Sequence, residues 1–217
     1  NDLNLMSPVM EAHQKCEAGN EKLLYYLAQM MNYPSCFEGL IYMTQLVQAD
    51  AIRLNVEHMR RNRGRCMGSL YWQVNDSNPV ISWSSIDYYH RWKALHYYAK
   101  KFYSPVLCSV NDENASDIII NVSNERMTEF NGKIKWRIRN NLAEIVEQGE
   151  SQVCVNALDA KNCVNIKNNI MITDRKMSRK HYLEYSLIEN GAVLSNSTFM
   201  FVQPKQFEFI NPNITYT

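Results

Sequence analysis

Apolar residues follow a helical period in the first half of the chain and a strand period in the second. Over residues 1–103 they recur at three- and four-residue steps, which predicts helices at 21–31, from residue 35 to about 61, and at 91–102. Asn20 is the expected N-cap of the first helix. Ser35 and Glu38 form the expected capping box of the second.

Between the second and third predicted helices lies a short apolar and aromatic run, residues 67–72. Its length and composition predict a buried strand. A polar loop follows from Gln73 to about Asp87. The order helix, strand, polar loop, helix is typical of an α/β domain, where loops at the carboxyl ends of strands hold the chemistry.

After Pro105 apolar positions alternate with polar ones. Strands are predicted at residues 106–110, 118–123, 132–139, 144–155, 169–173, 181–189 and 197–202. Turns at spacings of about 8–12 residues are typical of an antiparallel immunoglobulin-like β-sandwich. The predicted fold class is therefore α + β with several domains: residues 1–103 form the first, 104–203 the sandwich, and 204–217 a linker toward a further domain.

Composition and charge narrow the function classes. The 217 residues hold 23 Lys+Arg against 22 Asp+Glu, a balance that indicates no nucleic-acid partner and no membrane-surface partner. No apolar run approaches the ~18–20 residues that span a bilayer. Aromatic residues are abundant, with 13 Tyr, 7 Phe and 4 Trp.

The six Cys form no CxxC pair, and we expect free, mostly buried thiols.

Trp72 is the strongest single candidate for a functional residue. It ends the predicted strand, and Gln73, Asn75 and Asp76 follow it in the loop. A flat indole packs against the C–H face of a pyranose, while amides and carboxylates bind the hydroxyl groups. The pattern predicts a sugar-binding site formed by Trp72, Asn75 and Asp76. The alternative is a core tryptophan followed by a polar turn, and the pattern alone leaves both open.

The same segment offers no catalytic pair of carboxylates. A glycosidase needs two, about 5–9.5 Å apart. Only Asp76 and Asp87 lie in the loop, and Asp87 is better explained as the cap of the next turn. The histidines lack metal-ligand spacing, and no HExxH, GxSxG or phosphate-binding glycine loop occurs. We expect no catalytic residue, no metal and no cofactor in this chain.

Several strings resemble one known family. Residues 68–76 read GSLYWQVND, residues 82–89 read SWSSIDYY, and residues 91–97 read RWKALHY. With Gln45 and Gln48 upstream, they are similar to the β-mannosidases of glycoside hydrolase family 2. The likeness is close over about residues 6–110 and is a weaker fit of architecture over 111–210.

This resemblance implies that residues 1–103 are the C-terminal portion of a (β/α)8 barrel and that residues 104–203 are the following immunoglobulin-like domain. Trp72 would end the eighth barrel strand and line the subsite for the terminal sugar. The parent would be a retaining exo-glycosidase that removes terminal β-D-mannose. The family's acid/base Glu and nucleophile Glu would both precede residue 1, so this chain alone would be inactive.

Two other functions fit the residues. A helical cap with a sandwich describes a non-catalytic carbohydrate-binding or interaction module, and an exo-β-glucosaminidase would share the same motifs. The sandwich holds one tryptophan, Trp136, and strand alternation places it in the core with Ile134 and Ile138. A tryptophan in the core cannot stack on a sugar, so we expect no obvious aromatic binding surface on the sandwich.

The expected partner is a mannoside or oligosaccharide, with no nucleic acid and no membrane. A barrel strand without its sheet predicts that the first half self-associates or docks its helices on the sandwich. The residues themselves indicate no compartment. The usual setting of the family implies a periplasmic or secreted location in a bacterium.

Overall fold

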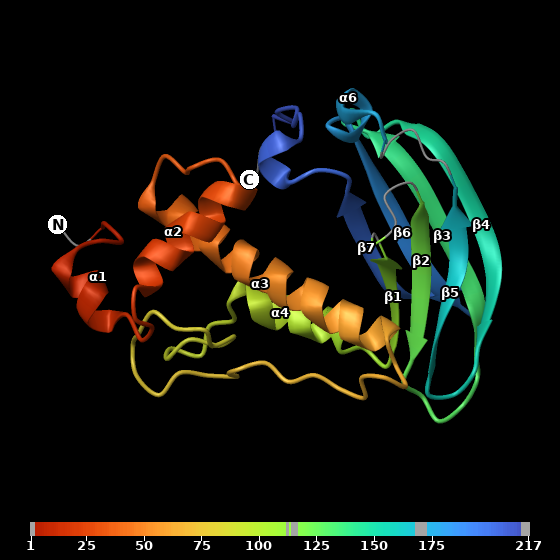
Figure 1. The fold of residues 1–217 in the computed structure, drawn as a ribbon, viewed down its shortest axis with the longest axis horizontal. Coiled ribbons are helices and arrows are strands. Elements are labelled where there is room, and N and C mark those ends of the chain that lie inside the picture. Colours follow the sequence, from red (N-terminus) through yellow and green to blue (C-terminus); the bar gives the residue numbers. More distant parts are fainter. Residues whose placement is uncertain (1–2, 112, 114–116, 168–172, 214–217) are drawn as a thin grey trace. The chain divides into compact units, whose positions relative to one another are not determined.

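The computed structural model describes residues 3–111, 113, 117–167 and 173–213. The chain divides into two compact units (Figure 1). The first comprises Asn1–Arg60 and Cys66–Tyr103, and the second Arg61–Arg65 and Ser104–Thr217. The first unit is built from helices and long irregular segments, and the second from antiparallel strands.

The first unit contains the helices α1 (Pro8–His13), α2 (Gly19–Met30), α3 (Phe37–Arg61) and α4 (Ala94–Phe102). The apolar stripes of α3 and α4 meet around Val56, Leu95 and Phe102. Those of α2 and α3 meet around Leu27 and Leu40. The predicted helices are therefore confirmed, although the last begins three residues later than expected.

Two predicted helix caps are wrong. Asn20 lies inside α2, because the N-cap is Ala18 in the left-handed region. The buried amide of Asn20 instead donates to the Leu5 carbonyl at 3.0 Å and to a Glu11 carboxylate oxygen at 2.6 Å. Before α3, Cys36 precedes the first helical residue, and its Sγ accepts from the Gly39 N–H at 3.4 Å. The Cys36 thiol thus accepts a hydrogen bond from the first turn of α3, the role that the sequence predicted for the Ser35 hydroxyl.

The predicted buried strand at residues 67–72 is also wrong. These residues are extended but belong to neither sheet. Met67 and Trp72 are 69% and 73% exposed, and Leu70 is fully exposed at 101%. A parallel strand needs a neighbour on each side to satisfy its backbone. The described residues provide no such neighbour for this segment, so its apolar side chains face solvent.

The second unit is a sandwich of two antiparallel sheets, which confirms the predicted sandwich. One sheet has the order β1-β2-β5 and the other the order β4-β3-β6-β7. The strands are β1 (Val106–Asn111), β2 (Ile118–Asn124), β3 (Phe130–Asn140), β4 (Ile145–Val155), β5 (Asp159–Ile166), β6 (His181–Glu189) and β7 (Ala192–Met200). A short helix, α6 (Arg175–Ser178), precedes β6.

Five of the predicted strands match β1, β2, β3, β4 and β6. The prediction missed β5, because its sequence DAKNCVNI carries few apolar residues and its strand pattern is weak. The predicted strand at 169–173 falls almost wholly outside the described residues, and its last residue, Thr173, is helical. The strand expected at 197–202 begins at Ala192, just after the Asn190–Gly191 turn.

Alternating side chains of both sheets form one apolar core. Among its fully buried members are Ile120, Ile134, Ile138, Leu183 and Leu187. Trp136 packs against this core, as the alternation predicted. All six cysteines are free thiols, but only Cys108 is buried, so the expectation of mostly buried thiols is wrong.

Part of the segment after β7 lies against the sandwich. The 3-10 helix η1 (Pro204–Gln206) is followed by Glu208, whose N–H donates to the Arg179 carbonyl at 2.8 Å. The Asn141 amide donates to the Glu208 carbonyl, also at 2.8 Å. The carboxylate of Glu208 lies 3.4 Å from Arg179 and 3.5 Å from Lys180. Residues up to 208 are therefore fixed on the sandwich.

Gly132 is where the sandwich tolerates a side chain least. A Cβ there would lie 2.5 Å from the Ile188 carbonyl oxygen and 2.5 Å from the Phe130 ring. We expect Gly132→Ala to destabilise the sandwich by about 1–3 kcal/mol through overpacking, measured by urea unfolding. Gly68→Ala is the matched control, because nothing lies within 4 Å of that Cβ. Equal unfolding midpoints for the two variants would contradict the expectation.

Candidate functional site

The loop after the extended segment 67–72 is ordered by its own backbone. Residues 73–76 lie beside residues 85–86, with a parallel bridge between Asn75 and Ile86. The Asp76 N–H donates to the Ile86 carbonyl at 3.2 Å. A polar loop without a regular strand is thus held at a defined shape by main-chain hydrogen bonds.

Asp76 lies at the centre of this loop with its carboxylate fully engaged. Its Oδ1 accepts from the Ser82 hydroxyl at 2.6 Å, and its Oδ2 accepts from the Ser84 hydroxyl at 2.5 Å. The Lys93 Nζ lies 3.3 Å from Oδ2 and donates to the Ser84 hydroxyl at 2.8 Å. The side chain of Asp76 is 2% exposed and that of Lys93 13%. Asp76 therefore links Ser82 and Ser84 of the loop to Lys93, which precedes α4.

The charge state of Asp76 follows from these contacts. Burial raises the pKa of its carboxyl. The hydrogen bonds from Ser82 and Ser84 and the charge of Lys93 outweigh burial, so the pKa lies below its ordinary value. Asp76 is an ionised acceptor near neutral pH and is not tuned as a proton donor.

Helix α3 holds the loop through two amide side chains. The Gln45 side chain accepts from the Ala94 N–H at 3.1 Å, which satisfies a free donor at the start of α4. One turn further along α3, the Gln48 side chain donates to the Trp83 carbonyl at 2.8 Å. The two glutamines are three residues apart and so lie on one helix face. They fix the end of the loop and the start of α4 to the same helix.

Ser85 connects the extended segment to α4. Its hydroxyl lies 2.9 Å from the Tyr71 hydroxyl, 3.0 Å from His96 Nδ1 and 3.0 Å from the Val74 carbonyl. The His96 ring in turn contacts Trp92, with ring centroids 4.4 Å apart. Tyr71 and the start of α4 are therefore held together through the Ser85 hydroxyl.

Side-chain exposure alternates along residues 68–73. The exposed positions are Gly68, Leu70 and Trp72, and the partly buried ones are Ser69, Tyr71 and Gln73. This period of two matches the pattern of a strand with one covered face, although these residues form no strand. Trp72 is 73% exposed, so no core formed by the described residues covers its indole.

The predicted site residues occupy different environments. Asn75 is exposed, and its backbone carbonyl accepts from the Gln73 side chain at 3.0 Å. Trp72 and Asn75 present free surface, whereas the carboxylate of Asp76 is saturated from within the loop. Trp72 and Asn75 are therefore open to a ligand, whereas Asp76 is held within the loop.

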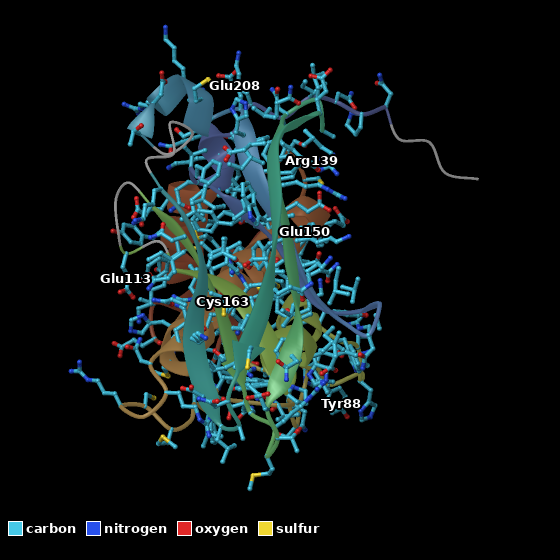
Figure 2. All side chains as sticks on the ribbon, turned by 90° about the vertical axis from the view of Figure 1, so that its right-hand side faces the viewer. Tyr88, Glu113, Arg139, Glu150, Cys163 and Glu208 are labelled. Atoms are coloured by element: carbon cyan, nitrogen blue, oxygen red, sulfur yellow. The ribbon has the colours of Figure 1, made fainter. Side chains whose placement is uncertain are left out.

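Further exposed aromatic rings come from the end of the loop. The exposed fractions are 44% for Tyr88, 62% for Tyr89 and 45% for Trp92. Figure 2 labels Tyr88. Asp87 caps this turn: its Oδ1 accepts from the Tyr89 and Arg91 N–H groups at 2.9 Å, which confirms the capping role. Burial raises the pKa of Asp87, but the hydrogen bonds and charge of Arg91 lower it below its ordinary value.

The residues that form the scaffold were only partly visible in the sequence. The prediction of a site at Trp72, Asn75 and Asp76 did not single out Lys93, Ser84 or Ser85. Their signal is weak, because serines and a lysine in a polar stretch are the default composition of a loop. The spacing of Gln45 and Gln48, which places both on one helix face, was the available sign that α3 holds the loop.

The part of the chain that the structure describes has neither a metal-binding cluster nor a membrane-spanning helix. No group of three or more His, Cys, Asp or Glu side chains in this part of the chain is arranged to hold a metal ion. Among the same residues, no helix has the length and apolar character needed to cross a membrane.

Known proteins resemble this chain over part of their length. Residues 116–206 match the Mannosidase Ig/CBM-like domain. The "Beta-mannosidase" of Bos taurus is 36% identical over 102 residues, which cover 41% of this chain and 12% of that protein. "Beta-mannosidase B" of Aspergillus niger is 33% identical over 111 residues, which cover 50% of this chain and 13% of that protein. The matches thus span only about an eighth of these relatives.

Solved structures share the fold. The β-D-mannosidase from Dictyoglomus thermophilum superposes with a TM-score of 0.88 at 24% identity, covering 97% of this chain and 25% of that protein. The exo-chitosanase CsxA from Amycolatopsis orientalis gives a TM-score of 0.72 at 18% identity, covering 87% of this chain and 22% of that protein. With the sequence matches, these structures confirm the resemblance that the motifs indicated. The chain is thus similar to β-mannosidases over part of its length, and residues 116–206 of its second unit match the Mannosidase Ig/CBM-like domain.

Proposed function

We propose that this chain is part of a retaining exo-glycosidase that removes terminal β-D-mannose residues. Residues 1–103 are the C-terminal portion of a (β/α)8 barrel, residues 104–203 the immunoglobulin-like domain, and residues 204–217 the linker toward a further domain. The single observation that carries the proposal is the sequence identity to proteins named β-mannosidase.

The geometry of residues 68–73 supports the barrel assignment. Their alternating exposure leaves Leu70 and Trp72 on one bare face and packs Tyr71 beside the helices. In a barrel, that bare face and both backbone edges are covered by neighbouring strands and by side chains of the barrel interior. Trp72 then stands at the carboxyl end of its strand, where barrel enzymes bind their substrates.

The chain's own residues bind and orient the sugar in this proposal. Trp72 offers an indole face to the C–H groups of the terminal mannose, and Asn75 offers an amide to its hydroxyl groups. Asp76 and Lys93 hold the loop that carries them. The two catalytic carboxylates come from outside this chain: one attacks the anomeric carbon, and the other protonates the leaving oxygen and then activates water.

The sugar preference has a direct test in the full-length protein. We expect p-nitrophenyl β-mannoside to be hydrolysed with a kcat/KM at least about a hundredfold above that for p-nitrophenyl β-glucosaminide, since hydrogen-bonding sites reject a mismatched group strongly. The second candidate function is an exo-β-glucosaminidase, which the fold shared with the exo-chitosanase favours. The reverse order of rates would establish that second function and overturn the first.

Self-association of the isolated chain is a further prediction. Leu70 and Trp72 lie on the exposed face of residues 68–73, Met67 is exposed as well, and the segment belongs to neither sheet. We expect the sedimentation coefficient of the 217-residue chain to rise with concentration, and Leu70→Glu to abolish the rise. Leu142→Glu, which changes a leucine that is 61% exposed on the sandwich, serves as the control. A concentration-independent monomer would contradict this prediction.

A further inference from the structure

Strand β3 carries a row of cations on the solvent face of the four-stranded sheet. Ile134 and Ile138 point into the sandwich core, so the alternate residues point outward. Those residues are Lys133, Lys135, Arg137 and Arg139. A two-residue step along a strand is about 7 Å, so the row places four positive charges along about 20 Å. The chain as a whole has a net charge of only +1, which makes this row a local feature.

Two carboxylates on neighbouring strands meet the ends of the row. Glu150 of β4 lies 2.9 Å from Lys133, and Glu184 of β6 lies 2.5 Å from Arg139. Figure 2 labels Arg139 and Glu150 on these strands. The Lys133 ammonium lowers the pKa of Glu150 by donating a hydrogen bond to it. Each end of the row is therefore neutralised by a close partner.

The two central cations are not neutralised in this way. Lys135 lies 3.9 Å from Glu150, and Arg137 lies 3.9 Å from Glu184, carboxylates that already have closer partners. Their side chains are 46% and 41% exposed. The four cations of the row thus share two carboxylates, and the head groups of Lys135 and Arg137 remain partly open to solvent.

On the neighbouring strands, each of these two cations has one carboxylate and one uncharged polar side chain opposite it. Lys135 lies opposite Glu150 and Ser186. Arg137 lies opposite Gln148 and Glu184. Gln152 is diagonal to Lys135, and Asn196 and Thr198 lie on β7, one strand further from the row. Toward one end the face is hollowed by an open depression of about 650 Å³, whose lining includes Lys133, Lys135, Asn131, Gln152 and Asn190. The depression is open to solvent and includes Lys135 but not Arg137 in its lining.

We propose that this face binds an acidic oligosaccharide, with Lys135 and Arg137 holding carboxylates of successive uronate residues. Amide and hydroxyl side chains at a regular spacing suit the many hydroxyl groups of a sugar chain. The face lacks an exposed tryptophan, because Trp136 packs on the core side, so stacking of a neutral pyranose is disfavoured. Charge complementarity therefore decides in favour of an anionic glycan.

The inference rests on the proposed function for the choice of sugar, β-linked mannuronate, which is mannose with a carboxylate at C6. The test is isothermal titration of the 217-residue chain with a β-1,4-mannuronate tetrasaccharide in low salt. The matched neutral ligand is β-1,4-mannotetraose. We expect the acidic ligand to bind about tenfold more tightly or better, and raised salt to weaken it.

Variants locate the binding to this face. Lys135→Gln and Arg137→Gln should each weaken mannuronate binding about tenfold, because a charge-assisted hydrogen bond is lost. Lys135→Arg should retain binding within about twofold, since the positive charge remains. Lys167→Gln removes an exposed lysine from the end of β5 and is the control for a general loss of charge.

Three results would overturn the inference: equal binding of the neutral tetrasaccharide, unchanged binding by the Lys135 and Arg137 variants, or equal binding of tetraglutamate. The last would assign the face to an acidic peptide. The assay contains no hydrolysis step, so its failure leaves the proposed β-mannosidase activity untouched. Failure of that activity would likewise leave the binding result standing.

Discussion

Replacing Trp72 with alanine in the full-length protein is expected to lower kcat/KM for a β-mannoside by about a hundredfold or more. The indole is 73% exposed on the bare face of residues 68–73 and precedes the polar loop directly. Its removal takes away the surface that orients the terminal sugar against the catalytic carboxylates. The measurement is steady-state hydrolysis of p-nitrophenyl β-mannoside by wild type and variant.

The control for Trp72→Ala is Tyr33→Ala. Tyr33 is 69% exposed, so it matches Trp72 in exposure, but it lies in the turn between α2 and α3. We expect its kinetics to be those of wild type. An unchanged rate for Trp72→Ala would remove Trp72 from the sugar site.

The second large effect is expected at Lys93. Lys93→Met removes the cation beside Asp76, whose side chain is 2% exposed, and leaves a buried carboxylate without its countercharge. We expect a loss of about 3 kcal/mol in the free energy of unfolding. The double variant Asp76→Asn/Lys93→Met should recover part of this loss, because no buried charge remains. Denaturant unfolding of all three proteins measures both effects.

The contribution of Asp76 to the free energy of unfolding depends on pH. Its pKa in the folded protein lies below the ordinary value of about 4. The stability that it adds is therefore complete above that ordinary value and is lost as the pH falls through the lower folded pKa. The difference in stability between wild type and Asp76→Asn should be constant from about pH 5 to 8 and shrink below about pH 4. A difference that grows on acidification would contradict this account.

The sequence predicted the sandwich well because its signal is local. Alternation with core residues such as Ile134 and Ile138 marks strands wherever one face is buried. The failure at β5 has the same cause, since Asn162 and Asn165 interrupt the apolar pattern. Helix bounds were predicted less well, because a cap depends on which backbone conformation precedes it. Asn20 and Ser35 are suitable residue types placed one or two positions away from the actual caps.

The candidate site was predicted in outline only. Composition located Trp72 and its loop, but assigned Asn75 and Asp76 the same role. Only the folded structure shows that Asp76 is enclosed by Ser82, Ser84 and Lys93. Those contacts join residues up to 17 positions apart through an irregular loop, and no periodicity encodes them. The predicted buried strand failed for a different reason: its apolar residues specify burial, but the described residues supply no sheet.

The most direct test of the account compares two proteins in one assay. Hydrolysis of p-nitrophenyl β-mannoside is measured for the 217-residue chain and for the full-length protein at equal concentration. The account predicts turnover by the full-length protein and none by the chain, because the catalytic carboxylate pair lies outside it. Turnover by the chain itself would contradict the account and would place the catalytic carboxylates among its own Asp and Glu residues.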